Sequence, residues 1–262
     1  MDAPGDLLSR KNLMKACILP DLEAISHKAA EIFLHLSGQY IASAGRFVLA
    51  LSGGTTPKRF YMLLGSDPLR NMIDWGRVHF FWVDERCVPK EDEESNYKLA
   101  FDTFLSKVPV RAANIHRIKG EDGPDKAASE YERDIRKFFG ISGFPAFDLI
   151  MLGVGEDGHT ASLFPRSKPL EEKTRLVVPV YMKKPISDRV SLTLPVLNNS
   201  DQIIFLAAGK SKAHIVRSVL LGDKEKKQYP AGLINPVNDK IQWLIDQEAA
   251  GKLTEKELQQ TG

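Results

Sequence analysis

The chain has 262 residues, 43% of them hydrophobic, which is enough to bury the core of one large α/β domain. Its 36 lysines and arginines nearly balance 34 acidic residues, so the net charge of +2 gives no reason to expect nucleic acid or an anionic membrane as a partner. The two cysteines, Cys17 and Cys87, lack metal-ligand spacing, and no apolar run approaches a membrane span, so we expect a cytoplasmic protein without metal or cofactor.

Five short apolar runs recur along the chain, and a polar segment follows most of them. They cover residues 47–51, 78–83, 147–152, 203–207 and 241–245. Helical patterns begin at about Pro57 and over residues 211–221, and a short one follows the last run. This alternation predicts an α/β fold: a Rossmann-like, doubly wound, mostly parallel sheet with helices on both faces. Ligands bind beyond the carboxyl ends of such strands, so we expect the polar segments to converge on one crevice.

The first polar segment, SGGTTP, has the composition of an anion-binding turn. Its glycines permit close backbone approach, Thr56 is a candidate N-cap and Pro57 suits the first helical position. The segment lacks the order of a Walker A loop and the third glycine of a dinucleotide fingerprint, so a phosphomonoester is favoured over a nucleotide. A tight turn without a ligand is the alternative. The predicted phosphate-binding residues here are Ser52, Gly53, Gly54 and Thr55.

The second segment places three charged residues, Asp84, Glu85 and Arg86, directly after an apolar strand. An internal ion pair of Arg86 with Asp84 or Glu85 is one interpretation. A guanidinium directed at a substrate is the other.

The third segment, GVGEDGHTASLFP, contains the best acid–base candidate among the six histidines, His159. We expect a short helix over residues 160–164, whose N-terminus would keep the imidazole neutral. Asp157 is a candidate partner for the ring or a cap for that helix. Ser162 lacks the G-x-S-x-G context of a hydrolase nucleophile, and we assign it to the helix.

Two later segments carry cations. Arg189 opens an alternating strand over residues 189–194 whose polar members are expected to share one face, where Arg189 is either an exposed edge residue or a phosphate clamp. Lys210 and Lys212 stand at a helix start, where cations oppose the helix dipole unless an anion accompanies them. We favour Lys212, one turn into the helix.

Together these motifs resemble the 6-phosphogluconolactonases, within the larger group of sugar-phosphate isomerases and deaminases. The matching segments are residues 49–61, 80–89 with 95–97, 153–165 and 189–213. The resemblance runs from about residue 47 to residue 243 and is weaker over 1–45 and 248–262, and we expect one sugar-phosphate-binding domain over 1–262. We expect a monomer, with an oligomer left open.

The resemblance implies hydrolysis of 6-phospho-D-glucono-1,5-lactone to 6-phospho-D-gluconate, in the oxidative branch of the pentose phosphate pathway. It implies that His159 is the general base and that Arg86 and Lys212 contact the substrate phosphate. A lactone is already electrophilic, so the reaction needs an anchored phosphate, a base for water and donors for the oxyanion, without a metal or a covalent nucleophile. The expected catalytic residues are His159, Asp157 and Asp84.

Two alternatives follow from the same group. Glucosamine-6-phosphate deaminases have a glutamate where this chain has Phe164, and an apolar residue there favours the lactonase. In that case Asp84, which aligns with the proton-abstracting aspartate of the deaminases, serves positioning or water contact. A sugar-phosphate-sensing regulator would carry a helix-turn-helix segment, whereas the residues ahead of Phe47 leave room for little beyond one long helix.

Overall fold

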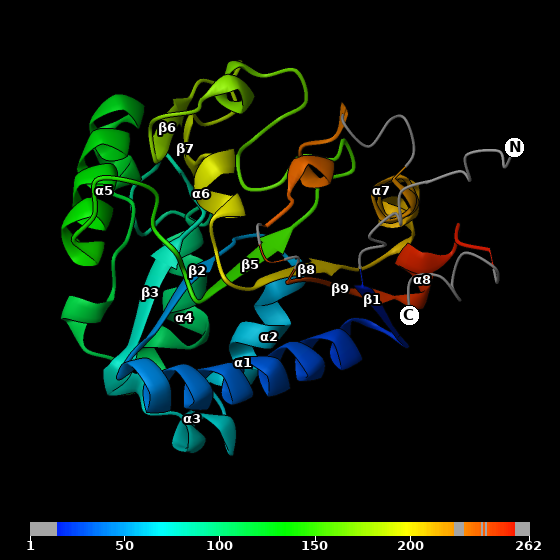
Figure 1. Cartoon of the computed structure of the whole chain (residues 1–262), viewed down its shortest axis with the longest axis horizontal. Coiled ribbons are helices and arrows are strands. Elements are labelled where there is room, and N and C mark those ends of the chain that lie inside the picture. The colour runs from blue at the N-terminus through cyan, green and yellow to red at the C-terminus, as the bar shows by residue number, and fades with distance from the viewer. Residues whose placement is uncertain (1–14, 223–227, 237, 239, 255–262) are drawn as a thin grey trace, which may run out of the picture.

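The computed structural model describes residues 15–222, 228–236, 238 and 240–254 (Figure 1). A six-stranded sheet runs through this part of the chain in the order β1-β9-β8-β5-β2-β3, and each of its pairs is parallel. Its strands are β1 (Lys15–Leu19), β2 (Phe47–Leu51), β3 (Val78–Trp82), β5 (Leu149–Gly153), β8 (Ile203–Ala207) and β9 (Ile241–Asp246). The expected mostly parallel sheet is confirmed, and β1 is a strand that the apolar runs did not predict.

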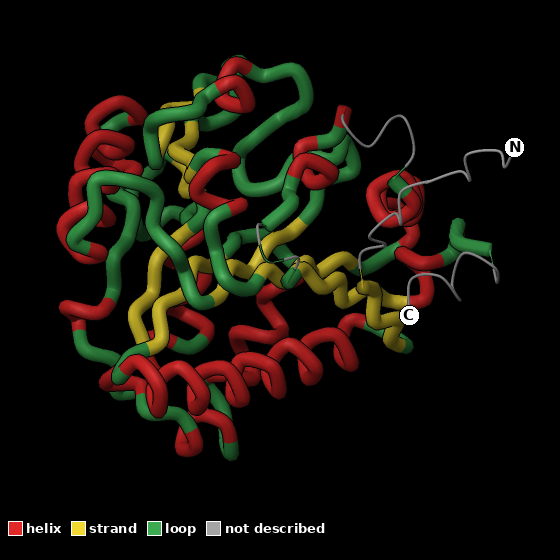
Figure 2. The backbone as a smooth tube through the Cα atoms, in the orientation of Figure 1, coloured by secondary structure: helices red, strands yellow, loops and turns green. Residues whose placement is uncertain are grey.

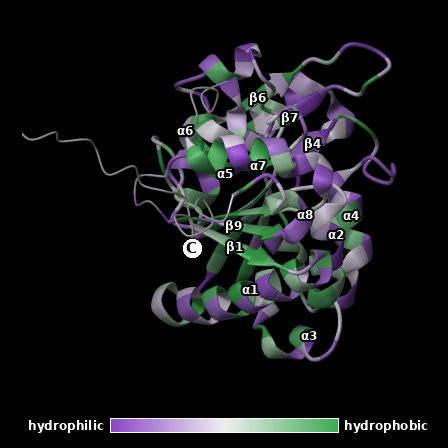
Figure 3. Cartoon of the chain, turned by 90° about the vertical axis from the view of Figure 1, so that its right-hand side faces the viewer, coloured by the Kyte–Doolittle hydropathy of each residue, from purple (hydrophilic) through white to green (hydrophobic). Residues whose placement is uncertain are grey.

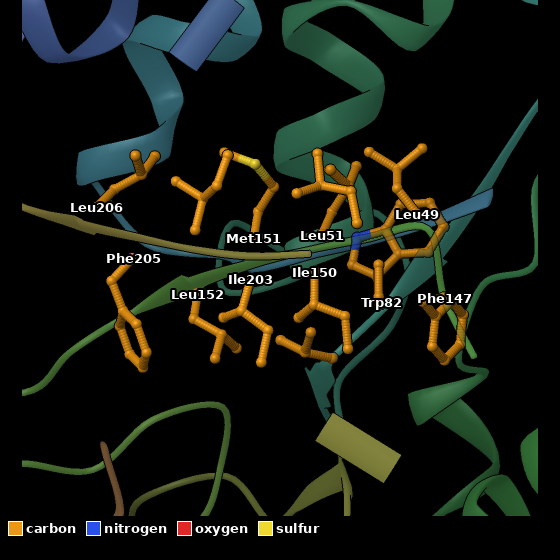
Figure 4. Close-up of a cluster of buried hydrophobic side chains, with 14 of the residues drawn as sticks. Leu49, Leu51, Trp82, Phe147, Ile150, Met151, Leu152, Ile203, Phe205 and Leu206 are labelled. Carbon is orange, nitrogen blue, oxygen red and sulfur yellow. The ribbon is translucent and has the colours of Figure 1, made fainter. Parts of the chain in front are cut away.

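The central strands are apolar on both faces, which is why their sequences read as continuous hydrophobic runs. All five residues of β2 and all five of β8 are buried. Leu51, Met151 and Leu206 lie on one side of the sheet, whereas Leu152 and Phe205 lie on the other (Figure 4). Hydrophobic residues gather along these strands, and hydrophilic ones along the outer surfaces of the helices (Figure 3).

Helices cover both faces of this sheet, as the sequence predicts. They are α1 (Leu22–Ala44), α2 (Thr56–Leu64), α3 (Leu69–Met72), α4 (Asn96–Thr103), α5 (Pro124–Phe139), α6 (Leu194–Asn198), α7 (Ala213–Leu221) and α8 (Gln247–Ala250). Helices α1 and α3 lie below the sheet in Figure 1, and α5 and α6 lie above it. The long first helix has local stop signals at both ends: the Asp21 side chain accepts a hydrogen bond from Ala24 N at 2.8 Å, and Gly45 ends it with φ 77°.

A second sheet, which the sequence did not predict, lies above the first (Figure 2). Its order is β4-β7-β6, both pairs are antiparallel, and the strands are β4 (Asp84–Arg86), β6 (Val177–Val180) and β7 (Arg189–Leu192). Val83 joins the two sheets, because its N–H donates to Leu51 O at 2.9 Å and its carbonyl accepts from Leu192 N at 2.8 Å. The second sheet therefore extends beyond the carboxyl edge of the first.

The expected strand over 189–194 is confirmed over Arg189–Leu192 but ends two residues earlier than expected. Ser191 and Thr193, two of its expected polar members, are buried. The physical reason is that β7 is the central strand of its sheet, so its polar side chains face other protein groups: Ser191 Oγ donates to Leu192 O, and Thr193 Oγ1 to Arg175 O.

Candidate active site

One polar pocket lies where the carboxyl ends of β2, β5 and β8 meet the second sheet. Its lining contains nine of the ten residues expected at the site: Ser52, Gly53, Gly54, Thr55, Asp84, Arg86, His159, Arg189 and Lys212. Asn96 and Ser211 also line it, whereas Lys210 does not. The tenth, Asp157, reaches the pocket through its hydrogen bond to His159. Five segments far apart in sequence thus meet in one cavity of about 400 Å³.

Two arginines face each other across the second sheet. Arg86 on β4 and Arg189 on β7 are directly paired in the antiparallel register. Like charges directly opposite one another destabilise a sheet. In addition, the Nε atoms of both arginines are buried without a hydrogen-bond partner in the described chain. Burial, and then the neighbouring Arg86 charge, lower the pKa of the Arg189 guanidinium. An anion between the two guanidinium groups would satisfy their unpaired donors and offset their repulsion.

The Arg86 side chain does not form the internal ion pair that was one interpretation of the charged segment. Arg86 Nη1 donates to Glu94 O at 2.6 Å, a neutral carbonyl that leaves its charge uncompensated. Glu85 instead accepts from the main-chain N–H groups of Arg86, Asn96 and Tyr97, at 2.7 to 2.8 Å. Burial raises the pKa of the Glu85 carboxyl to about 7, against the lowering effect of these hydrogen bonds.

The glycine-containing turn after β2 presents its backbone to the pocket. The N–H groups of Gly53, Gly54 and Thr55 donate to no described residue, and Gly54 has φ 95°. Helix α2 starts one residue earlier than expected, with Thr55 rather than Thr56 at the N-cap, and Thr55 makes no side-chain capping bond. The free N–H groups and the helix N-terminus together favour an anion at this turn.

Lys212 lines the pocket from the opposite side and makes no ion pair with a described residue. The expected helix over 211–221 is confirmed from Ala213 onward. A 3-10 turn over Lys210–Lys212 precedes it, so Lys212 lies at the N-cap of α7 rather than one turn inside the helix. A cation there is unfavourable for the helix dipole, and an anion in the pocket would compensate for it.

His159 and Asp157 form a short pair at the edge of the pocket. His159 Nδ1 lies 2.6 Å from Asp157 Oδ1, and the same oxygen accepts from His159 N at 3.1 Å. Burial acts to raise the pKa of Asp157, but the two hydrogen bonds from His159 lower it below its usual range. An ionised carboxylate only accepts, so Nδ1 is the ring nitrogen that donates in this pair, and Nε2 has no partner among the described residues.

The expected helix over 160–164 is absent, so no helix N-terminus lies at His159. Ala161 has φ 47°, and Thr160 and Leu163 form an isolated antiparallel bridge. Thr160 Oγ1 donates to Gly153 O at 2.9 Å, which bonds the turn back to the end of β5. The left-handed residue and this side-chain bond to the backbone replace the helical ladder. Asp157 therefore caps no helix.

Gly155 permits the close approach of the histidine and aspartate. A Cβ atom at Gly155 would lie 2.1 Å from His159 Nδ1 and 2.6 Å from Asp157 Oδ1. The Phe164 ring lies on another side of His159, with centroids 4.7 Å apart, and Arg189 Cζ lies 5.6 Å from the Phe164 centroid. Phe164 thus contacts both the histidine and one of the facing arginines.

Sequence reasoning missed two residues that shape the pocket. Asn96 donates to Asp84 O at 2.9 Å and approaches Asp84 Oδ1 at 3.3 Å. Ser162, expected to serve a local helix, instead donates to Asp84 Oδ2 at 2.6 Å. Asn96 lies within the matching segment 95–97 and could have been selected there, whereas no local signal in the sequence links Ser162 to Asp84.

Two kinds of feature were not found in the described segments. No group of three or more histidine, cysteine or acidic side chains there is arranged to hold a metal ion. No helix among the described residues has the length and hydropathy to span a bilayer.

Comparisons with known proteins agree on one family. The family model of the glucosamine-6-phosphate isomerases/6-phosphogluconolactonase matches residues 20–243. The chain is 39% identical over 233 residues to 6-phosphogluconolactonase 3, chloroplastic, of Arabidopsis thaliana, covering 86% of this chain and 70% of that one. It is 39% identical over 216 residues to the 6-phosphogluconolactonase of Synechocystis, covering 81% and 87%.

Solved structures agree with this grouping. The 6-phosphogluconolactonase of Thermotoga maritima superposes with a TM-score of 0.77 at 28% identity, covering 89% of this chain and all of that one. A monomeric glucosamine-6-phosphate deaminase superposes with a TM-score of 0.76 at 22% identity, covering 91% and 99%. At that identity the likeness concerns the fold alone, so the fold does not separate lactone hydrolysis from deamination.

Proposed function

The chain belongs to the glucosamine-6-phosphate isomerase/6-phosphogluconolactonase family, and we propose that its pocket hydrolyses 6-phospho-D-glucono-1,5-lactone with His159 as the general base. The protein is a lactone hydrolase of the oxidative pentose phosphate pathway, like the relatives that cover most of its length. The roles of individual residues are the part that we propose.

One observation carries the proposal: a histidine with a free ring nitrogen shares a pocket with three cations. Arg86 and Arg189 leave buried donors unpaired, and Lys212 makes no ion pair with a described residue. A phosphate group supplies the acceptors that these donors lack. The lactone ring then lies within reach of His159 when the 6-phosphate is anchored by the arginines, the lysine and the turn over 52–55.

The proposed chemistry uses a single water molecule. Neutral His159 accepts a proton at Nε2 from water as its oxygen attacks C1, and Asp157 stabilises the imidazolium that forms. The carbonyl oxygen of C1 becomes an oxyanion, which hydrogen-bond donors in the pocket stabilise. The bond between C1 and the ring oxygen then breaks, and His159 returns its proton to that oxygen. The product is 6-phosphogluconate, whose new carboxylic acid ionises in solvent.

Deamination of glucosamine 6-phosphate is the closest alternative, and Phe164 argues against it. Ring opening of an amino sugar needs a carboxylate at the place where this chain has an aromatic ring in contact with His159. An effector-binding regulator without catalysis is less suited, because α1, the long helix ahead of β2, packs against α2 and β9 as part of the domain itself.

We further propose that the protein acts as a single-domain, cytoplasmic monomer without a nucleic-acid or membrane partner. The balanced charge supports the absence of nucleic acid. The names of some relatives include a chloroplast location, so fractionation of the source cells tests the compartment, and sedimentation tests the oligomeric state.

A direct assay tests the proposed function. Loss of freshly generated 6-phosphogluconolactone, corrected for spontaneous hydrolysis, is followed with wild-type and His159→Ala protein. We expect acceleration by the wild type and near-background rates for the variant. Ammonia release from glucosamine 6-phosphate, without lactone hydrolysis, would overturn the assignment. Full activity of His159→Ala would overturn the base role alone.

A further inference from the structure

Ser162 is a buried polar residue that the proposed chemistry does not use. Its exposed fraction is 0%, and it does not line the pocket. Its hydroxyl donates to Asp84 Oδ2 on β4 at 2.6 Å, and its N–H donates to Ser191 Oγ on β7 at 3.2 Å. Both polar groups of this one residue therefore bond the second sheet, although Ser162 itself belongs to the turn that follows His159.

The acceptor, Asp84, is a buried carboxylate whose charge acts on Arg189 without a direct ion pair. It is 5% exposed, and no ion pair joins it to a described residue. Its side-chain donors are the Ser162 hydroxyl and, at 3.3 Å, the Asn96 amide. A carboxylate has about four acceptor positions, so capacity remains for a donor in the pocket that Asp84 lines, such as the attacking water.

Asn96 holds Asp84 from the other side and contacts the glycine turn. Its Oδ1 lies so near Gly53 that a Cβ atom there would be 1.7 Å from it. The orientation of the Asp84 carboxylate is thus set by one donor from the His159 segment and one from α4, beside the glycine turn. The segment after β3, the His159 segment and the glycine turn therefore meet at or beside this carboxylate.

We propose that Ser162 is a positioning residue, whose hydroxyl fixes the Asp84 carboxylate and keeps the His159 segment in register with the strand that carries Arg86. This inference rests on the proposed lactone hydrolysis. Ser162 is not a nucleophile, because a fully buried hydroxyl outside the pocket cannot reach C1. Ser162 affects the reaction only through Asp84. The Ser162 hydroxyl holds the Asp84 carboxylate in place, and hydrogen-bond donors in the pocket can contact that carboxylate.

Kinetics of five variants test this role. We expect Ser162→Ala to lower kcat by roughly 10- to 100-fold, the range for a hydrogen bond to a charged group, with little change in KM because the phosphate cations are untouched. Ser162→Cys, which keeps a weak donor, should recover part of the loss.

In an Asp84→Asn background, Ser162→Ala should change kcat by less than about threefold, because the two residues act as one unit. Ser200→Ala removes an equally buried hydroxyl, bonded to Leu197 O, and should leave kcat unchanged.

The outcomes separate this inference from the proposed function. A wild type that does not accelerate lactone hydrolysis would overturn both. An active wild type with unchanged kcat in Ser162→Ala would overturn only the positioning role. Losses that multiply in the double variant, or that follow a fall in the thermal unfolding midpoint, would mean that Ser162 merely stabilises the fold.

Discussion

Two histidine–aspartate pairs lie in the described part of this chain, in different surroundings. His159 Nδ1 lies 2.6 Å from Asp157, and His116 Nδ1 lies 2.9 Å from Asp134. The sequence motif singles out Asp157 and not Asp134, but both carboxylates lie within hydrogen-bond distance of their histidine. The two pairs differ in what surrounds the rest of each imidazole ring, including its Nε2 atom.

The His116 ring is held on all sides. It stacks on Phe81 with centroids 4.1 Å apart, and its Nε2 lies 3.4 Å from His79 Nδ1. The His159 side chain is 31% exposed, and its Nε2 has no partner among the described residues. The two pairs teach that a short bond to a carboxylate does not identify a catalytic histidine. A free second nitrogen beside uncompensated cations is the better criterion.

The largest expected effect contrasts the two histidines directly. His159→Ala should lower kcat by about 10³-fold, because it removes the base that activates water. His116→Phe, which keeps the stack on Phe81 and removes both hydrogen bonds, should leave kcat within about twofold of wild type. The measurement is the enzymatic rate of lactone hydrolysis for both variants. A kcat loss in His116→Phe equal to that of His159→Ala, in folded protein, would contradict the distinction.

The arginines near each pair offer a second contrast. Arg86 has a buried unpaired Nε, whereas Arg117, next to His116 in the chain, bonds both oxygens of Glu121 at 2.6 and 2.9 Å. Arg86→Ala should raise KM by roughly 10- to 100-fold, because a charge-assisted bond to the substrate phosphate is lost. Inhibition by inorganic phosphate should weaken in parallel.

Arg117→Ala is the matched control, and its KM should stay near that of wild type. If Arg86→Ala bound substrate and inorganic phosphate as the wild type does, the anion would have to be held by Arg189, Lys212 or the glycine turn instead.

The backbone around the His159–Asp157 pair provides a third contrast. A methyl group at Gly155 would meet His159 and Asp157, whereas one at Gly143 would meet nothing within 4 Å. Gly155→Ala should therefore lower kcat by about 10-fold through displacement of the ring, with KM little changed. Gly143→Ala should leave kcat unchanged. Equal kcat for the two variants would show that the turn over 155–159 adapts without moving the ring.

Much of this arrangement follows from local sequence. The buried strands of the first sheet have apolar runs because both faces are covered, and the segments after them meet at one edge because parallel strands end together. These two rules are enough to bring His159, Arg86 and Lys212 toward one crevice. Phe164 could also be identified as a contact of the base from its place in the motif.

Other features depend on contacts that local patterns do not encode. Strand β4 has only three residues and β6 contains Pro179, so neither has the length or composition of a predictable strand. Their pairing with β7 places Arg86 opposite Arg189, which no periodicity predicts. The hydrogen bond of Ser162 joins residues 78 positions apart. The helix expected over 160–164 failed because bonds to distant segments override a weak local propensity.

The smallest expected effect concerns stability around the second pair. Burial, then the charges of His116 and Arg46, lower the pKa of His79 to about 4 from 6.5. The folded state therefore resists a proton that the unfolded state accepts, so His79 costs stability as the pH falls from 6.5 toward 4. Because the ring is partly solvated, we expect about 1 kcal/mol of this loss between pH 7 and pH 5, and His79→Gln should remove it.

Urea unfolding at both pH values measures the difference, with exposed His27→Gln as the control. A wild type and His79→Gln with the same pH dependence of unfolding free energy would show that the ring accepts its proton in the folded state. The His116 pair would then be solvated, and its contrast with His159 would rest on the position of the cations alone.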